Sequence, residues 1–404
     1  MSTSAPISTS SIIAPMGQSA AASAAVQSMA ELGVAGVLGA GYVQQGFLTP
    51  PTIKALSRAT FSILLPMFLC TSIITSVNKY GLSRSQLAVP ILAIIQSLVL
   101  YTVTTQITLP LFGIDDQSDD GRGATVCCSF GNSGVIPLIF CESLFRRSTA
   151  ADNVAKSTAF VSLFLVGWSP FFWSFGREVL LSNANSGCSV DDNTAGLLAT
   201  VKRAFPPPVI GVFIGLFIAT TPLCSLFTTT SADTAEKAPL AVIFDSVSNF
   251  GRAASPLSLL ILVASLAVGA GVGTCSKQKM QSSIQQSKEV HVETRNNPNI
   301  SFLTKWSFVS LTRVFLSPAL MYGLLNLSAR TGIIGDADAD PMLWFVLILE
   351  ASMPPAQNSV TMYQVADKGE EAGEMAKFLF AVYATCMLPI VLVLTWALEK
   401  FGLA

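Results

Sequence analysis

Charged side chains are scarce in this 404-residue chain, where they make up 12% of the residues, against roughly 25% in an ordinary soluble domain. Apolar residues make up 51%, and they gather in runs of about 20 residues, the length that crosses a bilayer. The formal net charge of −1 provides no basic field that could release counterions from nucleic acid. The composition therefore predicts a polytopic membrane protein and excludes a nucleic-acid partner.

Histidine is almost absent: the chain has one, His291, in a polar stretch. The eight cysteines are scattered through mostly apolar runs and form no CxxC pair, so they are interpreted as small packing residues. No HExxH motif, paired intramembrane aspartates or serine with a histidine partner is present. We therefore expect no metal site, no cofactor and no enzymatic activity.

The apolar runs predict an all-α protein with ten transmembrane helices. The first 22 residues are rich in Ser, Thr and Ala without a basic region, and are predicted to be a disordered tail. Residues 23–180 form the first group of five spans and residues 204–400 the second. A cytosolic connection, 181–203, separates the groups, and a polar loop, 275–298, lies inside the second. The predicted spans are 25–46, 55–77, 85–111, 123–145, 155–180, 205–226, 239–268, 304–327, 342–364 and 374–398.

Two of these spans are interrupted by helix-breaking residues. Gly131-Asn132-Ser133-Gly134-Val135-Ile136-Pro137 divides the fourth, and Met353-Pro354-Pro355-Ala356-Gln357-Asn358-Ser359 divides the ninth. An unpaired backbone group at membrane depth costs several kcal/mol, so such breaks normally line a buried site. Interrupted spans in matching halves are the best sequence pointer to the binding site of a transporter.

Prolines suggest an internal repeat. They fall in spans two to five of the first half and seven to ten of the second, and the last two of each half are almost equally spaced. Because each half has an odd number of spans, the halves are expected to insert with opposite topology, as an inverted repeat. Lys and Arg are more frequent in the loops that follow odd-numbered spans, which predicts that both termini are lumenal or exoplasmic.

A half-helix that begins at membrane depth directs free N–H groups and a partial positive charge toward its N-terminus. We therefore expect the two breaks to bind a substrate carboxylate, although Asn132 and Asn358 could instead only cap the broken helices. Glu350, close to the second break, is a candidate coupling group, the alternative being a carboxylate that is paired with Arg313 or hydrogen-bonded to a neighbouring helix. The predicted substrate-binding residues are Asn132, Ser133, Pro137, Pro354, Pro355, Gln357, Asn358 and Ser359.

Other candidates are less specific. The roles of Glu31, Asp245 and Arg252 are left undecided, although the last two have the spacing of one helical face. An apolar substrate would need walls beside the carboxylate site. The residues within sequence reach of the two breaks are Phe130, Ile136, Met353, Met362 and Tyr363, which are equally ordinary core residues.

Four segments resemble the auxin efflux carrier superfamily, and within it the PIN-likes branch. Cys128–Leu138 is similar to the fourth span of that family and Met353–Ser359 to its ninth. Phe205–Gly211 resembles the start of the sixth span, and Asp245–Leu257 the seventh. The resemblance implies two inverted five-helix repeats in which broken helices four and nine cross at their prolines. It also implies an auxin-type organic acid as ligand and, because the central loop is short, the endoplasmic reticulum membrane ahead of the plasma membrane.

The sequence thus predicts a secondary transporter or facilitator of a small organic anion, with indole-3-acetic acid as first candidate, embedded in membrane lipid. The resemblance implies that spans three to five and eight to ten move against spans one, two, six and seven. Homodimerisation and the coupling ion are left open. The alternatives are a sodium- or proton-coupled antiporter or symporter of the same fold, or a membrane receptor that binds the anion without transporting it.

Overall fold

Helices make up all the regular structure in the described part of the chain. The computed structural model describes residues 18–81, 83–145, 151–182, 207–228, 238–269, 301–366 and 368–403. Each predicted span coincides with helix in these ranges. Six helical stretches are long and apolar enough to cross a membrane, namely Pro50–Tyr80, Arg84–Leu111, Asp152–Leu181, Ala241–Val268, Phe302–Arg330 and Gly369–Lys400. The described residues therefore form an all-helical, multi-pass membrane protein.

The first half of the chain contains one interrupted helix, whose two parts are α6 (Asp119–Ser129) and α7 (Val135–Phe145). The helix α1 begins at Gln18, so residues 18–22 of the predicted tail lie within it, and residues 1–17 lie outside the described part. The elements are α1 (Gln18–Gln44), α2 (Pro50–Ala59), η1 (Thr60–Leu64), α3 (Leu65–Tyr80), α4 (Arg84–Val103), η2 (Thr104–Thr108), α5 (Leu109–Leu111), α6 (Asp119–Ser129), α7 (Val135–Phe145), α8 (Ala151–Phe171), η3 (Phe172–Gly176) and α9 (Arg177–Leu181).

The second half contains a similar break between α18 and α19. Most of the predicted connection 181–203 and all of the predicted loop 275–298 lie outside the described residues. The elements are α11 (Pro207–Thr220), α12 (Cys224–Phe227), α13 (Ala241–Arg252), α14 (Ala254–Gly269), α16 (Phe302–Leu311), η4 (Thr312–Leu316), α17 (Ser317–Arg330), α18 (Pro341–Ser352), α19 (Asn358–Val365) and α20 (Gly369–Lys400).

The segments η1 to η4 are short π-helical turns within longer helices. Three of them, η1, η2 and η4, end two residues before Pro66, Pro110 and Pro318. A proline lacks the N–H for the usual bond and its ring clashes with the carbonyl four residues earlier. The wider π turn relieves that clash by extending the bonding pattern to five residues. These prolines therefore widen the helices instead of ending them.

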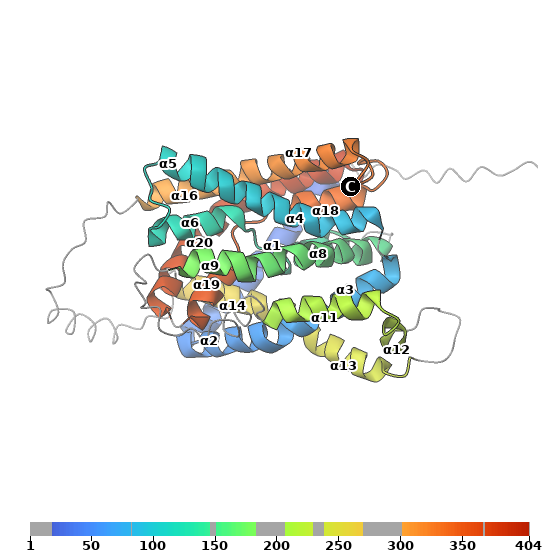
Figure 1. Cartoon of the computed structure of the whole chain (residues 1–404). Helices are drawn as coiled ribbons and strands as arrows, with labels where there is room; N and C mark the ends of the chain where they lie inside the picture. Colours follow the sequence, from blue (N-terminus) through green and yellow to red (C-terminus); the bar gives the residue numbers. More distant parts are fainter. Residues whose placement is uncertain are drawn as a thin grey trace, which may run out of the picture.

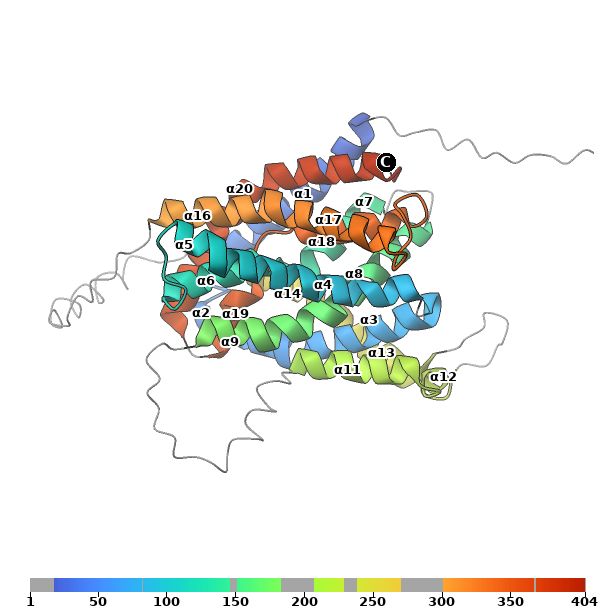
Figure 2. The same ribbon diagram turned by 45° about the horizontal axis from the view of Figure 1, so that its top comes forward.

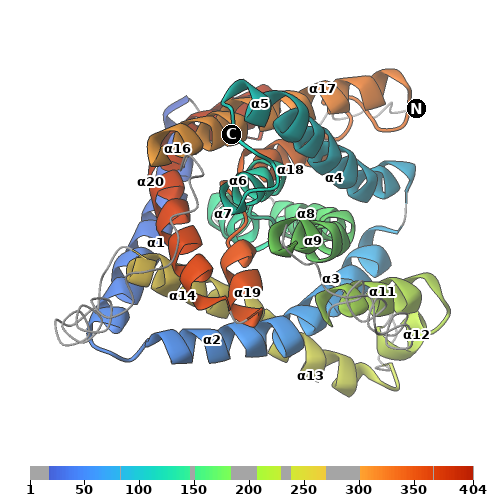
Figure 3. The same ribbon diagram turned by 60° about the vertical axis from the view of Figure 1, so that its left-hand side comes forward.

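The long helices run roughly parallel through the molecule, and the short segments α6, α7, α18 and α19 lie among them (Figure 1; Figure 2). Figure 3, a view nearly along α8 and α9, shows α6, α7, α18 and α8 surrounded by α1, α20, α16, α4, α3 and α2. Burial agrees with this arrangement, because every residue of α18 from Met342 to Ser352 is buried. The two interrupted helices therefore occupy the centre of the bundle.

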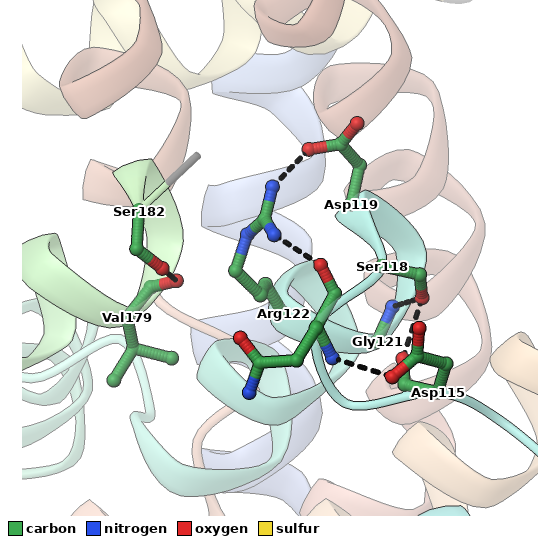
Figure 4. Close-up of polar contacts among 8 residues, drawn as sticks. Asp115, Ser118, Asp119, Gly121, Arg122, Val179 and Ser182 are labelled. Atoms are coloured by element: carbon green, nitrogen blue, oxygen red, sulfur yellow. Dashed lines mark hydrogen bonds and ion pairs between the residues drawn. The ribbon is translucent and has the colours of Figure 1, made fainter. Parts of the chain in front are cut away.

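Polar contacts fix the beginning of α6 (Figure 4). The Ser118 hydroxyl accepts a hydrogen bond from the Gly121 N–H at 2.9 Å, as an N-cap does, and donates one to the Asp115 carbonyl at 2.6 Å. The Arg122 side chain, which is 5% exposed, donates to the Gln117 carbonyl and pairs with Asp119. These contacts anchor the end of the helix that leads to the first break.

Candidate functional site

The two breaks meet in the centre of the molecule and satisfy each other's backbone. Gly131 and Pro355 form an isolated antiparallel bridge. The Asn132 N–H donates to the Pro354 carbonyl at 2.7 Å, and the Ala356 N–H donates to the Phe130 carbonyl at 3.0 Å. Two segments that cannot continue as helix therefore replace their lost helical bonds with bonds to each other, which avoids the high cost of unpaired groups at membrane depth.

Arg313, in η4, binds the carbonyl ends of both interrupted helices. Its side chain is 2% exposed, and its Nε donates to the Met353 carbonyl at 2.9 Å. Its two Nη atoms donate to the carbonyls of Cys128 and Ala351, each at 3.3 Å. These carbonyls lie at the C-terminal ends of α6 and α18, where helix dipoles place partial negative charge. One buried guanidinium thus neutralises both ends.

Two glycines of the first break are required by this geometry. A Cβ on Gly131 would lie 2.0 Å from Nη2 of Arg313, so residue 131 must have no side chain for the guanidinium to reach the crossing. Gly134 has a φ of +103°, a conformation that other residues rarely adopt. It directs the chain into α7. In the Gly-Asn-Ser-Gly sequence, Gly131 thus leaves space for Arg313 and Gly134 turns the backbone.

Tyr383, on α20, joins the two breaks from the other side. The Asn132 side-chain amide donates to the Tyr383 hydroxyl at 2.6 Å, and that hydroxyl donates to the Pro355 carbonyl at 2.9 Å. Asn132 is 2% exposed. The Asn132 side chain therefore stabilises the contact between the two breaks.

The N-terminal ends of α7 and α19 open into one central cavity. Ser133 and Gly134 line it at the start of α7, and Gln357 and Asn358 line it at the start of α19. The first N–H groups of a helix have no partner within the helix and carry partial positive charge. Arg313 binds the carbonyl groups at the ends of α6 and α18, and the N-terminal ends of α7 and α19 line the cavity. The place where the two breaks cross therefore offers hydrogen-bond donors to the cavity.

The other cavity walls come from distant parts of the chain. They are formed by α2, η1 and α3, by α8 and η3, and by α14. Within the described residues, the lining contains no Asp, Glu, Lys, Arg or His. The remaining lining residues are Ser57, Thr60, Phe61, Leu65, Phe68, Leu69, Leu165, Trp168, Ser169, Trp173, Ala254, Ser255, Ser258, Ile261 and Thr361.

The chain is similar to known membrane transport proteins. Residues 24–187 match the model of a family described as membrane transport protein. Protein PIN-LIKES 7 of Arabidopsis thaliana is 30% identical over 172 residues, which cover 42% of this chain and 35% of that protein. Protein PIN-LIKES 1 of the same plant is 22% identical over 299 residues, which cover 65% and 56%. The resemblance to the PIN-likes branch is confirmed.

The chain matches less than two thirds of the length of either PIN-likes relative. The matched family is described as membrane transport protein, in line with the prediction that the chain is not an enzyme. Among the described residues, no three His, Cys, Asp or Glu side chains come together as a metal site.

The structure divides the predicted substrate-binding residues into two sets. Ser133, Gln357 and Asn358 line the cavity. The others, which contribute to the crossing or to the helices that leave it, are absent from its wall, and all are buried. They are Asn132, Pro137, Pro354, Pro355 and Ser359.

Glu350 lies beside the crossing but outside the cavity wall. It is 1% exposed, and the Ser133 side chain lies beside its carboxyl group, but neither carboxyl oxygen forms a hydrogen bond of good geometry with the described residues. No ion pair within 4 Å joins it to Arg313, whose N–H groups bond carbonyls instead. The predicted alternative of a Glu350–Arg313 pair is therefore not found.

Most walls of the central cavity differ from those that the sequence predicts. The candidate wall residues Phe130, Ile136, Met353, Met362 and Tyr363 do not line the cavity, and its aromatic wall consists of Phe61, Phe68, Trp168 and Trp173. Asp245 and Arg252 are exposed on α13, away from the crossing, and the side chain of Glu31 lies outside the described part. Sequence proximity to the breaks could not identify α2 and α8 as walls, because they approach the crossing only through tertiary packing.

Proposed function

We propose that this chain is a secondary transporter or facilitator of a small organic anion, with indole-3-acetate as first candidate. The observation that carries the proposal is the pair of half-helix N-termini at one cavity whose described lining has no charged side chain. Such ends attract anions without a basic side chain. A carboxylate bound by Ser133, Gln357 and Asn358 and by the nearby N–H groups would be held without a compensating buried charge.

An aromatic ring suits the remainder of the cavity. Phe61 and Trp173 lie with ring centroids 4.7 Å apart, and Trp168 stacks on Phe172 at 4.6 Å. Ligand sites are typically apolar, with a few convergent polar groups. Aromatic walls beside a donor surface match an acid that carries a flat apolar body, which supports an auxin-type acid.

Movement between two sets of helices would admit the substrate. The cavity has a volume of about 40 Å³, far below the roughly 300–1,000 Å³ of ligand pockets. One wall comes from α2, η1, α3 and α14, and the other from α7, α8 and α19. These belong to spans two and seven and to spans four, five and nine. This division supports motion of spans three to five and eight to ten against spans one, two, six and seven.

Larger cavities flank the central one along the helix Pro50–Tyr80. A cavity of about 320 Å³ near Tyr80 shares Phe68 with the central cavity and is lined by Lys79 and Arg252. Another of about 440 Å³ lies near Pro50. A small cavity between it and the centre shares Gln357 with the central cavity and Ser265 with the outer one. This succession supports a path along the interface.

An inverted repeat of two five-helix units, residues 23–180 and 204–400, forms part of the proposal. It is supported by the π segments η2 and η4, which lie in the third and eighth spans and each end two residues before a proline. Both flank the crossing of the fourth and ninth spans, since Thr104 of η2 and Thr312 of η4 are buried beside Cys128. Equivalent turns at equivalent spans are expected from a repeat.

Location and partners are proposed from the sequence. The short central connection and the loop charges support an endoplasmic reticulum membrane with both termini in the lumen. Membrane lipid and the organic anion are the proposed partners, and a homodimer is left open.

The second candidate is a proton- or sodium-coupled carrier of the same fold. Glu350 favours it, because this buried carboxyl group beside the crossing forms no hydrogen bond of good geometry with the described residues and could carry the coupling ion. A receptor that binds the anion without transport is the third candidate.

Uptake of radiolabelled indole-3-acetate into proteoliposomes, with proton and sodium gradients imposed separately, tests these functions. We expect saturable uptake that Asn358→Ala weakens, because Asn358 lines the cavity. Asn326→Ala, on α17 and away from the cavity, is the control. Binding without flux would support the receptor, flux that follows one cation gradient would support the coupled carrier, and neither binding nor flux for organic acids would contradict the proposal.

A further inference from the structure

Four residues on the wall of the central cavity carry polar atoms that have no hydrogen-bond partner among the described residues. Ser57 and Thr60 are buried, yet their hydroxyl oxygens have no hydrogen-bond partner among the described residues. The indole nitrogens of Trp168 and Trp173 are equally unpartnered, in side chains only 3% and 2% exposed. All four residues line the cavity. A buried polar group without a partner is rare in a native structure and costs roughly 1–3 kcal/mol.

The elements that carry these residues place them on one cavity without involving the crossing. Ser57 and Thr60 are three residues apart on the α2–η1 helix, and therefore neighbours on its surface. Trp168 and Trp173 are five residues apart, a spacing that a regular α-helix would turn to different faces. The π segment η3 begins between them and widens the turn, and both residues line the cavity.

The chemistry of these groups is that of a donor site. An indole N–H can donate a hydrogen bond but cannot accept one, and hydroxyl groups can donate as well. Neither indole can accept a hydrogen bond from the N–H of the other. Packing holds the rings in place, with Trp168 stacked on Phe172 and Trp173 against Phe61. Only a group that contributes an acceptor atom can serve as partner for these two N–H groups.

We propose that Ser57, Thr60, Trp168 and Trp173 form a second polar subsite that binds an oxygen acceptor of the transported anion, separate from its carboxylate. This inference rests on the proposed function, in which the carboxylate occupies the helix ends at Ser133 and Asn358. Within the proposed class of organic anions, it favours acids with a hydroxyl, carbonyl or second carboxyl oxygen on the part that faces α2 and α8, ahead of indole-3-acetate, whose ring has no such oxygen. It also makes this wall a determinant of specificity.

Two matched acids test the subsite on the full chain in lipid nanodiscs by titration calorimetry. 4-Hydroxyphenylacetate carries an oxygen at the end opposite its carboxylate, and 4-methylphenylacetate has nearly the same shape without it. We expect the unsubstituted protein to bind the hydroxy acid more tightly. Trp173→Phe and Trp168→Phe retain an aromatic ring and remove the N–H. Each should lower the affinity for the hydroxy acid about fivefold, which corresponds to one net hydrogen bond. The affinity for the methyl acid should fall less than twofold.

Trp306→Phe, which lies on α16 outside the cavity wall, should change neither affinity. Thr60→Val, which keeps the shape of the side chain, repeats the test if a tryptophan variant fails to elute as a single folded species. An equal loss of affinity for both acids, or no loss of affinity for the hydroxy acid, would contradict the subsite without contradicting the proposed function. Failure of both acids to bind the unsubstituted protein, with no binding of indole-3-acetate, would overturn the two together.

Discussion

The guanidinium of Arg313 lies against the backbone of Gly131, in the space that a side chain at position 131 would need. A Cβ there would come within 2.0 Å of Nη2 and 3.0 Å of Cζ. This contact allows one arginine to reach the carbonyls of Cys128, Ala351 and Met353 at the ends of two helices. The crossing therefore depends on a buried cation from a third helix as well as on the two breaks.

Gly131→Ala should destabilise the protein because the new methyl group displaces the guanidinium from its carbonyls. Overpacking in a well-packed interior costs roughly 1–3 kcal/mol, and the lost hydrogen bonds add to it. Thermal unfolding in detergent, followed by tryptophan fluorescence, measures the change. Gly323→Ala is the matched control, since no heavy atom lies within 4 Å of its added Cβ and alanine favours a helix interior. Equal melting temperatures for the two variants would contradict the steric argument.

Arg313→Lys and Arg313→Met should both lower stability, although lysine keeps the charge. The planar fork donates to three carbonyls in different directions, which a single ammonium on a flexible stem does not reproduce. Each buried carbonyl left unpaired costs roughly 1–3 kcal/mol. Denaturation in a series of detergent mixtures gives the comparison, with Arg330→Met, an exposed position on α17, as control. A lysine variant as stable as the unsubstituted protein would show that charge alone is sufficient.

Tyr383→Phe and Asn132→Ala should each weaken the crossing, and their effects should not add. The Tyr383 hydroxyl receives a hydrogen bond from Asn132 and gives one to the Pro355 carbonyl, so either change breaks the same network. A double-mutant cycle of unfolding free energies should therefore give a coupling of about 1 kcal/mol. Thr385→Val, two residues further along α20 and exposed, serves as control partner. Additive effects would mean that Asn132 acts elsewhere, including on a substrate.

The positions of the helices and of both breaks could be predicted from the sequence, because helix length, proline and glycine are local signals. The sequence predicts that Asn132 and Asn358 both bind the substrate, but the structure gives them different surroundings. Asn358 lines the cavity, whereas the Asn132 side chain bonds Tyr383. Tyr383 is 251 residues from Asn132 in the chain, and no local pattern connects them.

The cavity walls could not be predicted for the same reason. Ser57, Thr60, Trp168 and Trp173 belong to ordinary apolar spans, in which a hydroxyl or an indole is unremarkable until its hydrogen-bond partners are known. The absence of such partners among the described residues is a property of the packed structure. The sequence does contain one signal, since Pro66 follows η1 by two residues and indicates where that helix widens.

Glu350→Gln should distinguish a proton-coupled carrier from a facilitator. The carboxyl group is buried beside the crossing and forms no hydrogen bond of good geometry with the described residues, and glutamine has the same shape but cannot lose or gain the proton. If Glu350 carries the proton, the variant should lose the acceleration of indole-3-acetate uptake by an inward proton gradient and still exchange labelled for unlabelled substrate. Glu399→Gln, at the exposed end of α20, should behave as the unsubstituted protein. Acceleration that survives in Glu350→Gln would rule out this carboxyl group as the coupling site.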